Sequence, residues 1–155
     1  MADLDAIDCA LLDILQLEGD LPNVELARRV RLSPAATLRR VQRLRAERVI
    51  TSVRAVVDPR AVGARLEAFV LITLVEHSEA GDDRFADALA RLPAVLRADS
   101  VTGTDDVLLH VSAADTDELQ DVLKELPRIG AARVTTMLSL GAVKPAAPVP
   151  TRPTR

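Results

Sequence analysis

Residues 23–50 read NVELARRVRLSPAATLRRVQRLRAERVI and predict two short helices joined by a tight turn. The second of them should start at Ser33-Pro34, because serine is a good N-cap and proline at the first helical position loses no hydrogen bond. From Arg28 to Arg54 the chain has nine arginines and a single acid, Glu47. A cationic helix pair of this kind is typical of proteins that bind the backbone and major groove of duplex DNA.

The positive charge is confined to this part of the chain, whose formal net charge is −3 overall. Residues 61–141 carry seven basic side chains against fourteen acidic ones. A local field attracts DNA more than net charge does, so an acidic total does not exclude DNA binding. Phe69 and Phe85 are the only aromatic residues. Single-stranded nucleic acid is a poor candidate ligand, because its bases usually stack on aromatic side chains.

A helical wheel of the segment after Ser33 predicts which side chains face outward. Leu38, Val41 and Leu44 fall on the core face, and Arg45 should lay its stem along the apolar side. A solvated face is the general alternative for any cluster of charges. The residues predicted to contact DNA are Ser33, Ala35, Ala36, Arg39, Arg40 and Arg43, with Arg28 and Arg31 as candidates for the phosphate backbone.

The remaining N-terminal sequence completes a small helical domain. Residues 4–18 have one apolar stripe at helical spacing, and Gly19 is a stop signal. An extended segment follows the third helix, and Asp58-Pro59 with Gly63 predicts a turn. We expect a winged-helix-like helix-turn-helix domain over residues 1–50 and a linking strand and turn over residues 51–64.

The second half contains an internal repeat. FADALARLPAVL at 85–96 and LQDVLKELPRIG at 119–130 share apolar positions at helical spacing and a Leu-Pro stop. Strand-like runs flank these two helices, at residues 66–75, 95–101, 106–112 and 133–140. The order βαββαβ predicts a ferredoxin-like domain over residues 65–141 and an α+β protein as a whole.

The first strand of this domain is apolar on both of its faces. Two helices can cover only one face of a sheet, so the other is expected to pack on a second copy of the chain. The sequence therefore predicts a homodimer. Residues 142–155, AVKPAAPVPTRPTR, are proline-rich and predicted to be disordered.

No pattern for catalysis, metal binding or a cofactor is visible. Cys9 is the only cysteine, and His77 and His110 lack the spacing of a metal site or a nucleophilic triad. The chain has no phosphate-binding glycine loop. Its start is not that of a signal peptide and no apolar run reaches membrane length, so a cytoplasmic protein with no membrane partner is expected.

With these parts in place, the chain resembles the Lrp/AsnC (leucine-responsive, feast/famine) family of transcription regulators over residues 4–141. The likeness rests on LDAIDCALLDILQLEGDLPNVELARRVRLSPAATLRRVQRL at 4–44, RVITSVRAVVDPRAVG at 48–63 and VTGTDDVLLHV at 101–111. The last of these lies where the family has a Val-Ser/Thr-Gly-Asp-x-Asp hairpin. Here Thr104 replaces the first aspartate and Asp105 replaces the usual aromatic residue.

The resemblance implies a regulator that forms dimers through its sheet and assembles further into tetramers or octamers. It also implies an amino acid or related metabolite as effector, bound between neighbouring dimers near the hairpin. Asp106 would then receive an ammonium group, and Thr104 with backbone amides a carboxylate. The candidate effector-binding residues are Ser100, Thr102, Gly103, Thr104, Asp106, Thr135 and Thr136.

Two alternatives stay open at this point. The hairpin could be only a connection between strands, since Gly and Asp are common turn residues. The protein could also be a metabolite-binding protein or a small enzyme of ferredoxin-like fold whose helical domain binds other proteins. The absence of a catalytic pattern favours the DNA-binding regulator.

Overall fold

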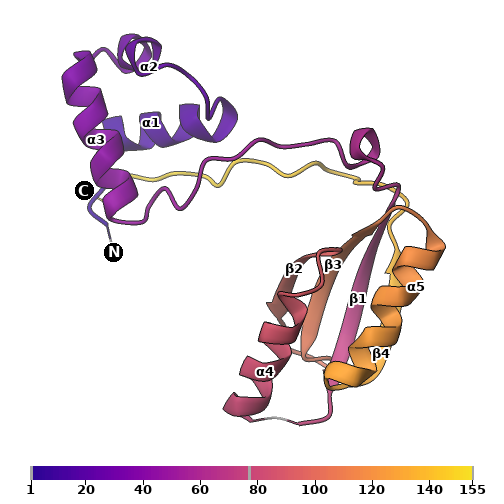
Figure 1. Ribbon diagram of the computed structural model, residues 1–155. Coiled ribbons are helices and arrows are strands. Elements are labelled where there is room, and N and C mark those ends of the chain that lie inside the picture. Colours follow the sequence, from indigo (N-terminus) through magenta and orange to yellow (C-terminus); the bar gives the residue numbers. More distant parts are fainter. Residues whose placement is uncertain (1, 77, 155) are drawn as a thin grey trace. The chain divides into compact units, whose positions relative to one another are not determined.

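A computed structural model describes residues 2–76 and 78–154 (Figure 1). The chain divides into two compact units, and each has its own hydrophobic core. Residues 2–56 and 144–154 form the DNA-binding unit, named here for its predicted role, and residues 57–143 form the ligand-binding unit. The first unit therefore extends beyond the expected domain of residues 1–50. None of the described helices is long and apolar enough to cross a membrane.

The DNA-binding unit contains three helices, α1 (Ala6–Leu17), α2 (Asn23–Val30) and α3 (Pro34–Ala46). Helix α3 starts where the sequence predicts: the Ser33 side chain accepts a hydrogen bond from the Ala36 amide at 3.2 Å, with Pro34 at the first helical position. Leu11, Leu26 and Val41 form the core between the helices. This packing holds α3 against α1 and α2 and leaves its far side exposed.

The ligand-binding unit has the predicted βαββαβ order. Its elements are a 3₁₀ turn η1 (Pro59–Val62), β1 (Leu66–Leu74), α4 (Glu79–Leu89), β2 (Val95–Ser100), β3 (Val107–Ala113), α5 (Thr116–Glu125), a 3₁₀ turn η2 (Leu126–Ile129) and β4 (Ala131–Leu138). The strands form one antiparallel sheet in the order β2-β3-β1-β4. Helices α4 and α5 lie on the same face of this sheet (Figure 1). The fold is ferredoxin-like.

The two faces of the sheet differ in burial. The face toward the helices is closed, and Val70, Ile72 and Leu109 are fully buried there. The other face has no cover among the described residues. Its exposed or half-buried side chains come from three neighbouring strands and define the open sheet face: Phe69, Leu71, Leu108, His110 and Met137. The Phe69 ring is 38% exposed and stacks on His110, with ring centroids 5.1 Å apart.

The C-terminal tail differs from the sequence prediction. Residues 144–154, expected to be disordered, lie against α1 and belong to the DNA-binding unit. The amide side chain of Gln16 makes two hydrogen bonds with the backbone of Val149, and Thr151 donates to Asp13. Composition predicts disorder because the tail is rich in proline and has no regular apolar pattern. The contacts that hold it are polar instead, and composition does not show them.

Candidate nucleic-acid interface and ligand pocket

The exposed face of α3 differs from the predicted face by a shift of one residue along the sequence. Thr37 is fully buried, and its hydroxyl donates to the Ser33 carbonyl at 3.1 Å. Because this hydrogen bond satisfies the hydroxyl, Thr37 can occupy a core position and Leu38 turns outward, with 46% of its surface exposed. The exposed side chains define the outward stripe of α3: Ala35, Leu38, Arg39, Gln42 and Arg45. The predictions that Leu38 and Arg45 face the apolar side are wrong.

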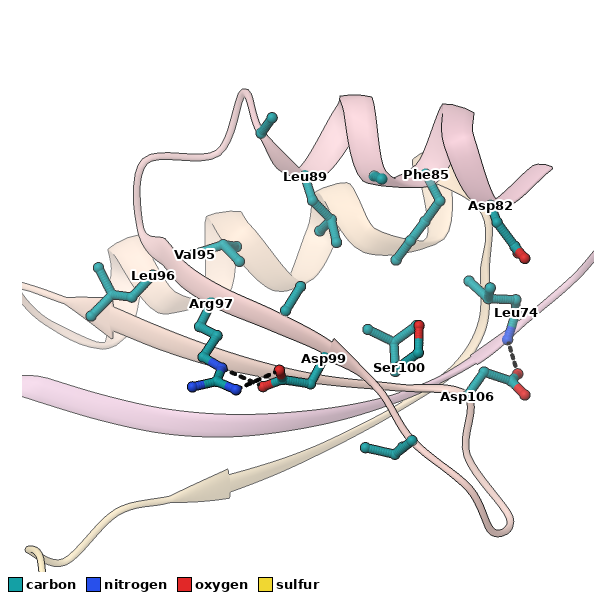
Figure 2. Close-up of a pocket in the computed structure, with 15 residues that line it drawn as sticks. Leu74, Asp82, Phe85, Leu89, Val95, Leu96, Arg97, Asp99, Ser100 and Asp106 are labelled. Atoms are coloured by element: carbon teal, nitrogen blue, oxygen red, sulfur yellow. Dashed lines mark hydrogen bonds and ion pairs between the residues drawn. The ribbon is translucent and has the colours of Figure 1, made fainter. Parts of the chain in front are cut away.

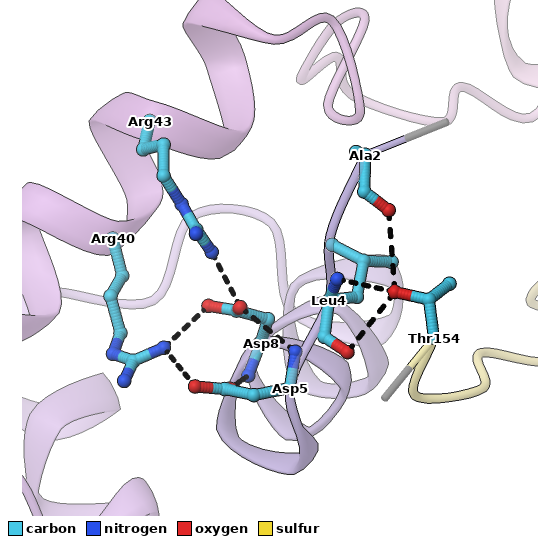
Figure 3. A network of polar contacts seen from close by, with 7 residues as sticks. All are labelled: Ala2, Leu4, Asp5, Asp8, Arg40, Arg43 and Thr154. Atoms are coloured by element: carbon cyan, nitrogen blue, oxygen red, sulfur yellow. Dashed lines mark hydrogen bonds and ion pairs between the residues drawn. The ribbon is translucent and has the colours of Figure 1, made fainter.

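Two predicted DNA-contacting arginines face α1 instead (Figure 3). Arg40 Nη1 donates to Asp5 Oδ2 at 2.7 Å and to Asp8 Oδ1 at 2.8 Å. Arg43 Nη2 donates to the other oxygen of Asp8, which is only 1% exposed. Arg40 and Arg43 were predicted to lie on the exposed face; a buried carboxylate on α1 draws both guanidinium groups toward it, although 41% of the Arg43 side chain stays exposed. We call these four residues the Asp8 cluster.

The charges of the Asp8 cluster stabilise one another. The pKa of Asp5 is lowered, first by the hydrogen bond from the Asp8 amide and then by Arg40. The pKa of Arg40 is raised by its hydrogen bonds to Asp5 and Asp8, and that of Arg43 by its hydrogen bond to Asp8. A buried carboxylate costs free energy unless it is paired and hydrogen-bonded, and Asp8 has both kinds of partner. The cluster thus fixes α3 on α1.

The other arginines between residues 23 and 46 fall into two groups. Arg28 and Arg29 both pair with Glu25, and Arg29 also pairs with Glu18. These pairs lower the pKa of Glu25 to about 2, chiefly through the hydrogen bond from Arg28. Across the described residues, no ion pair engages the second group, which consists of Arg31, Arg39 and Arg45. Unpaired guanidinium groups on an exposed surface are available to phosphates and base edges.

The remaining predicted DNA-contacting residues lie at the start of α3 and the turn before it. Ser33 and Ala35 are exposed, whereas Ala36 is half-buried. Arg31 caps α2 in the left-handed conformation, with φ of 57°. Sequence reasoning missed Leu38, Gln42 and Arg45. The acids Asp5 and Asp8 are the sequence signal for this orientation. They pair with Arg40 and Arg43 of α3, which turns Leu38, Gln42 and Arg45 outward.

A pocket of about 530 Å³ lies between α4 and the edge strand β2 (Figure 2). Its wall is apolar and comes from Leu74, Phe85, Leu89, Val95 and Leu96. The polar residues Asp82, Ser100 and Asp106 lie toward one end of the pocket, and Arg97 and Asp99 of β2 add charged groups away from that end. A cavity of this size with both apolar and polar lining is typical of small-molecule sites. Arg97, at the opposite edge, makes two hydrogen bonds with Asp99.

The structure brings only two of the seven predicted effector residues to this pocket, Ser100 and Asp106. Asp106 Oδ2 also accepts a hydrogen bond from the Leu74 amide at 2.8 Å, which ties the hairpin to β1. The other five do not line the pocket: Thr102, Gly103 and Thr104 lie in the hairpin turn, and Thr135 and Thr136 lie on β4. Asp82 of α4 does line it, and sequence analysis did not include that residue among the effector candidates.

Asp105, which stands at the family's aromatic position, has a structural role. It accepts hydrogen bonds from Thr73 Oγ1 at 3.2 Å and from Arg133 Nη2 at 2.9 Å. Arg133 is the main cause of the lowered pKa of Asp105. The neighbouring turn uses Gly103 at φ of 134°, a conformation that favours glycine. Asp105 thus fastens the turn to the sheet.

Metal chemistry has no visible basis in the described part of the chain. No group of three or more His, Cys, Asp or Glu side chains is placed there to hold a metal ion. His77 lies outside the described residues. Cys9 is buried in α1 as a free thiol.

A helix-turn-helix unit joined to a ferredoxin-like unit with its own pocket defines a class of ligand-responsive DNA-binding proteins. Residues 4–45 match the AsnC-type helix-turn-helix domain, and residues 67–149 match the Lrp/AsnC ligand binding domain. The chain belongs to the Lrp/AsnC family of transcription regulators. This membership favours the regulator over the alternative of a small enzyme.

Individual relatives agree with this result. The chain is 40% identical over 149 residues to the leucine-responsive regulatory protein of Rhizobium meliloti, covering 95% of this chain and 96% of that protein. It is 36% identical over 123 residues to the protein of the same name from Escherichia coli strain K12, covering 79% and 75%. All of these relatives are regulators, and the chain is not an enzyme.

Solved structures show the same two-unit fold. A transcriptional regulator from Neisseria meningitidis, solved as a complex with L-methionine, has a TM-score of 0.88 at 29% identity, covering 95% of this chain and 96% of that one. An AsnC family regulator from Agrobacterium tumefaciens has a TM-score of 0.87 at 28% identity, covering 95% and 97%.

Proposed function

We propose that this regulator binds double-stranded operator DNA with the outward stripe of α3 and that an amino acid bound by the ligand-binding unit changes this affinity. The observation that carries the DNA proposal is the division of the arginines. Arg31, Arg39 and Arg45 are exposed and unpaired among the described residues, whereas Arg40 and Arg43 are held by Asp8. Because its proposed partner is operator DNA, we place the protein in the cytoplasm.

The stripe supplies the side chains that read base edges. Arg39 can bind guanine O6 and N7 with two hydrogen bonds, and Gln42, one turn on, can bind adenine N6 and N7 in the same way. Ala35 and Leu38 suit contact with a thymine methyl group. Arg45 then lies near the phosphate backbone at the other end of the helix.

The N-terminal end of α3 supplies contacts to the backbone. Ser33 and Ala36 lie where the first amides of the helix can approach a phosphate, and Arg31 precedes them with its charge unpaired in the described structure. Arg28 reaches a phosphate only by leaving Glu25. Arg40 and Arg43 act as positioning residues that hold α3 on α1.

We propose a homodimer through the open sheet face as the basic assembly, with tetramers or octamers built from it. The support is an apolar face centred on Phe69 and Met137, which are 38% and 45% exposed. A dimer places two copies of α3 in successive major grooves, so the operator should be a rough palindrome with half-sites about one turn apart, or a multiple of it. Gel filtration of Phe69→Glu should show a smaller species than wild type, and Val75→Glu, which alters a side chain 70% exposed, should not.

The pocket between α4 and β2 is the proposed effector site. Its carboxylates Asp82 and Asp106 suit an ammonium group, Ser100 can bond a carboxylate, and the apolar wall suits an aliphatic side chain. The relatives support this class of ligand, since one is named leucine-responsive and another was solved with L-methionine. We therefore expect L-leucine or L-methionine to bind.

The deciding experiment is an electrophoretic mobility shift with the DNA upstream of the protein's own gene. It should be run at several stated salt concentrations, with and without L-leucine or L-methionine, because affinity for DNA depends steeply on salt. We expect a shifted complex that wild type forms and Arg39→Ala forms poorly. Equal binding to an unrelated duplex at every salt concentration would contradict the proposal of a specific operator.

A further inference from the structure

The outer face of α1 carries the C-terminal tail as an extended strand that runs antiparallel to the helix. The contacts pair Val149 with Gln16, Thr151 with Asp13 and Thr154 with Leu4. Helix α1 covers Ala6–Leu17, and Leu4 precedes it by two residues. The three contacts occur in opposite order along the two segments, so the tail runs along α1 from near its end to just before its start.

Gln16 recognises one residue of the tail with both ends of its amide. Its Oε1 accepts from the Val149 amide at 2.7 Å, and its Nε2 donates to the Val149 carbonyl at 3.0 Å. Pro150 restricts Val149 to an extended conformation, in which the amide and the carbonyl of one residue point to the same side. Pro148 and Pro150 have no N–H group, so Val149 alone among these three residues can make the paired contact. This contact sets the register of the tail.

The far end of the tail is fixed at the start of α1 (Figure 3). The Leu4 amide donates to Thr154 Oγ1 at 2.7 Å, and the Thr154 amide donates to the Leu4 carbonyl at 2.9 Å. Leu4 directly precedes Asp5, which caps α1 and accepts a hydrogen bond from Arg40. The tail therefore ends beside the cluster that holds α3.

Charge also favours this contact. The first twenty residues contain six acids and no base, and the last fourteen contain three bases and no acid. A polyproline II segment leaves its backbone groups free to bond and loses little conformational entropy on docking.

We propose that α1 is a docking surface for this proline-rich tail, and that the docked tail is a second connection through which the ligand-binding unit acts on the DNA-binding unit. The first connection is the chain that leads from α3 to β1. The tail begins where the ligand-binding unit ends, at residue 143, and reaches the residues that position α3. Its docking stands on the contacts above, whereas its effect on DNA rests on the proposed function.

Docking is tested by hydrogen exchange of the full-length protein, read by mass spectrometry on peptides that cover residues 147–154. The amides of Val149 and Thr154 should exchange at least about fivefold more slowly than in a synthetic peptide of residues 142–155, the factor expected for one net hydrogen bond. Exchange at the rate of the free peptide overturns the proposal.

A matched pair of variants tests the register. Val149→Pro keeps the tail extended but removes the amide that Gln16 binds, so the Thr154 amide should exchange as in the free peptide. Ala147→Pro adds the same residue two positions earlier, where the structure has no hydrogen bond to break, and should keep the protection. Equal protection in both variants would show that Gln16 does not select Val149.

The same pair tests the connection between the units. With L-leucine or L-methionine as ligand, Val149→Pro should keep DNA affinity without ligand within about twofold of wild type and lose the change that the ligand causes. Ala147→Pro should keep that change. A protected wild-type tail with an unchanged ligand response in Val149→Pro overturns the connection and leaves only docking. If neither ligand alters DNA binding in wild type, the proposed effector is wrong, and the exchange data still decide docking.

Discussion

Two arginines that are neighbours in the sequence have opposite surroundings on α3. Arg39 is exposed and meets no ion-pair partner among the described residues. Arg40 points the other way and is bonded to Asp5 and Asp8 of α1. The difference shows that a basic residue on a recognition helix serves DNA only if the rest of the domain leaves its charge unpaired.

The largest effect is expected from removing Asp8. The Asp8→Ala variant leaves Arg40 and Arg43 without their buried partner, which should lower the free energy of unfolding by about 3 kcal/mol. Asp20→Ala, at an exposed acid of the same unit, should stay within about 0.5 kcal/mol of wild type. The protein has no Trp or Tyr, so urea unfolding is best followed by circular dichroism. A stable Asp8→Ala protein would mean that the two arginines do not depend on that carboxylate.

The next effect separates the two arginines directly. Arg39→Ala should weaken operator binding by about 1–3 kcal/mol. It should leave the unfolding midpoint unchanged, because no ion pair engages Arg39 in the part of the chain that the structure describes. Arg40→Ala should lower the unfolding midpoint and affect operator binding mainly through the loosened α3. Fluorescence anisotropy with an operator duplex and a scrambled duplex, beside thermal unfolding, measures both quantities. A loss of operator selectivity in Arg40→Ala, with Arg39→Ala binding like wild type, would contradict this prediction.

A smaller effect is expected at Arg31, an unpaired arginine whose backbone is strained. Arg31 and Arg48 both have φ near 57°, which costs a non-glycine residue about 1 kcal/mol. Glycine at either position should therefore stabilise the protein by up to about 1 kcal/mol. Only Arg31→Gly should also weaken binding to every duplex and lower the salt slope by about one, since Arg31 lies beside the start of α3.

The control for this prediction is Arg48→Gly, which relieves the same strain beyond the other end of α3. Its salt slope should equal that of wild type. A loss of DNA affinity in both variants would point to a general effect of backbone flexibility and not to a phosphate contact.

The fold could be predicted from sequence because it depends on local signals. Ser33-Pro34 marks the start of α3, and the two Leu-Pro repeats mark the helices of the ferredoxin-like unit. The orientation of α3 could not be predicted in the same way. It depends on Thr37, whose hydroxyl is satisfied within the helix, and on Asp8, which is distant in sequence from the arginines it binds. A helical wheel contains neither interaction.

The lining of the pocket proposed as the effector site could be predicted only in part, for a similar reason. Ser100 and Asp106 belong to the hairpin motif, which sequence reasoning identified. Asp82 reaches the same pocket from α4, and only the packing of that helix beside β2 brings the three together. The tail is a further case, because the contact between Gln16 and Val149 joins residues at opposite ends of the chain.

The smallest expected effect concerns the exposed ion pairs of α2 and completes the comparison of paired and unpaired arginines. The folded protein lowers the pKa of Glu25 from 4.5 to about 2, so the stability that Glu25 contributes is fully present above pH 4.5 and is lost as the pH falls toward 2. Because the pairs with Arg28 and Arg29 are exposed, the effect should be small and weaken further with salt. Glu25→Gln should make the acid unfolding curve shallower over this range and release Arg28, whereas Arg29 keeps its pair with Glu18. If the released arginine then reaches a phosphate, the Glu25→Gln variant should bind every duplex more tightly and show a steeper salt slope. An unchanged salt slope would mean that the ion pair with Glu25 is not what keeps this arginine from DNA.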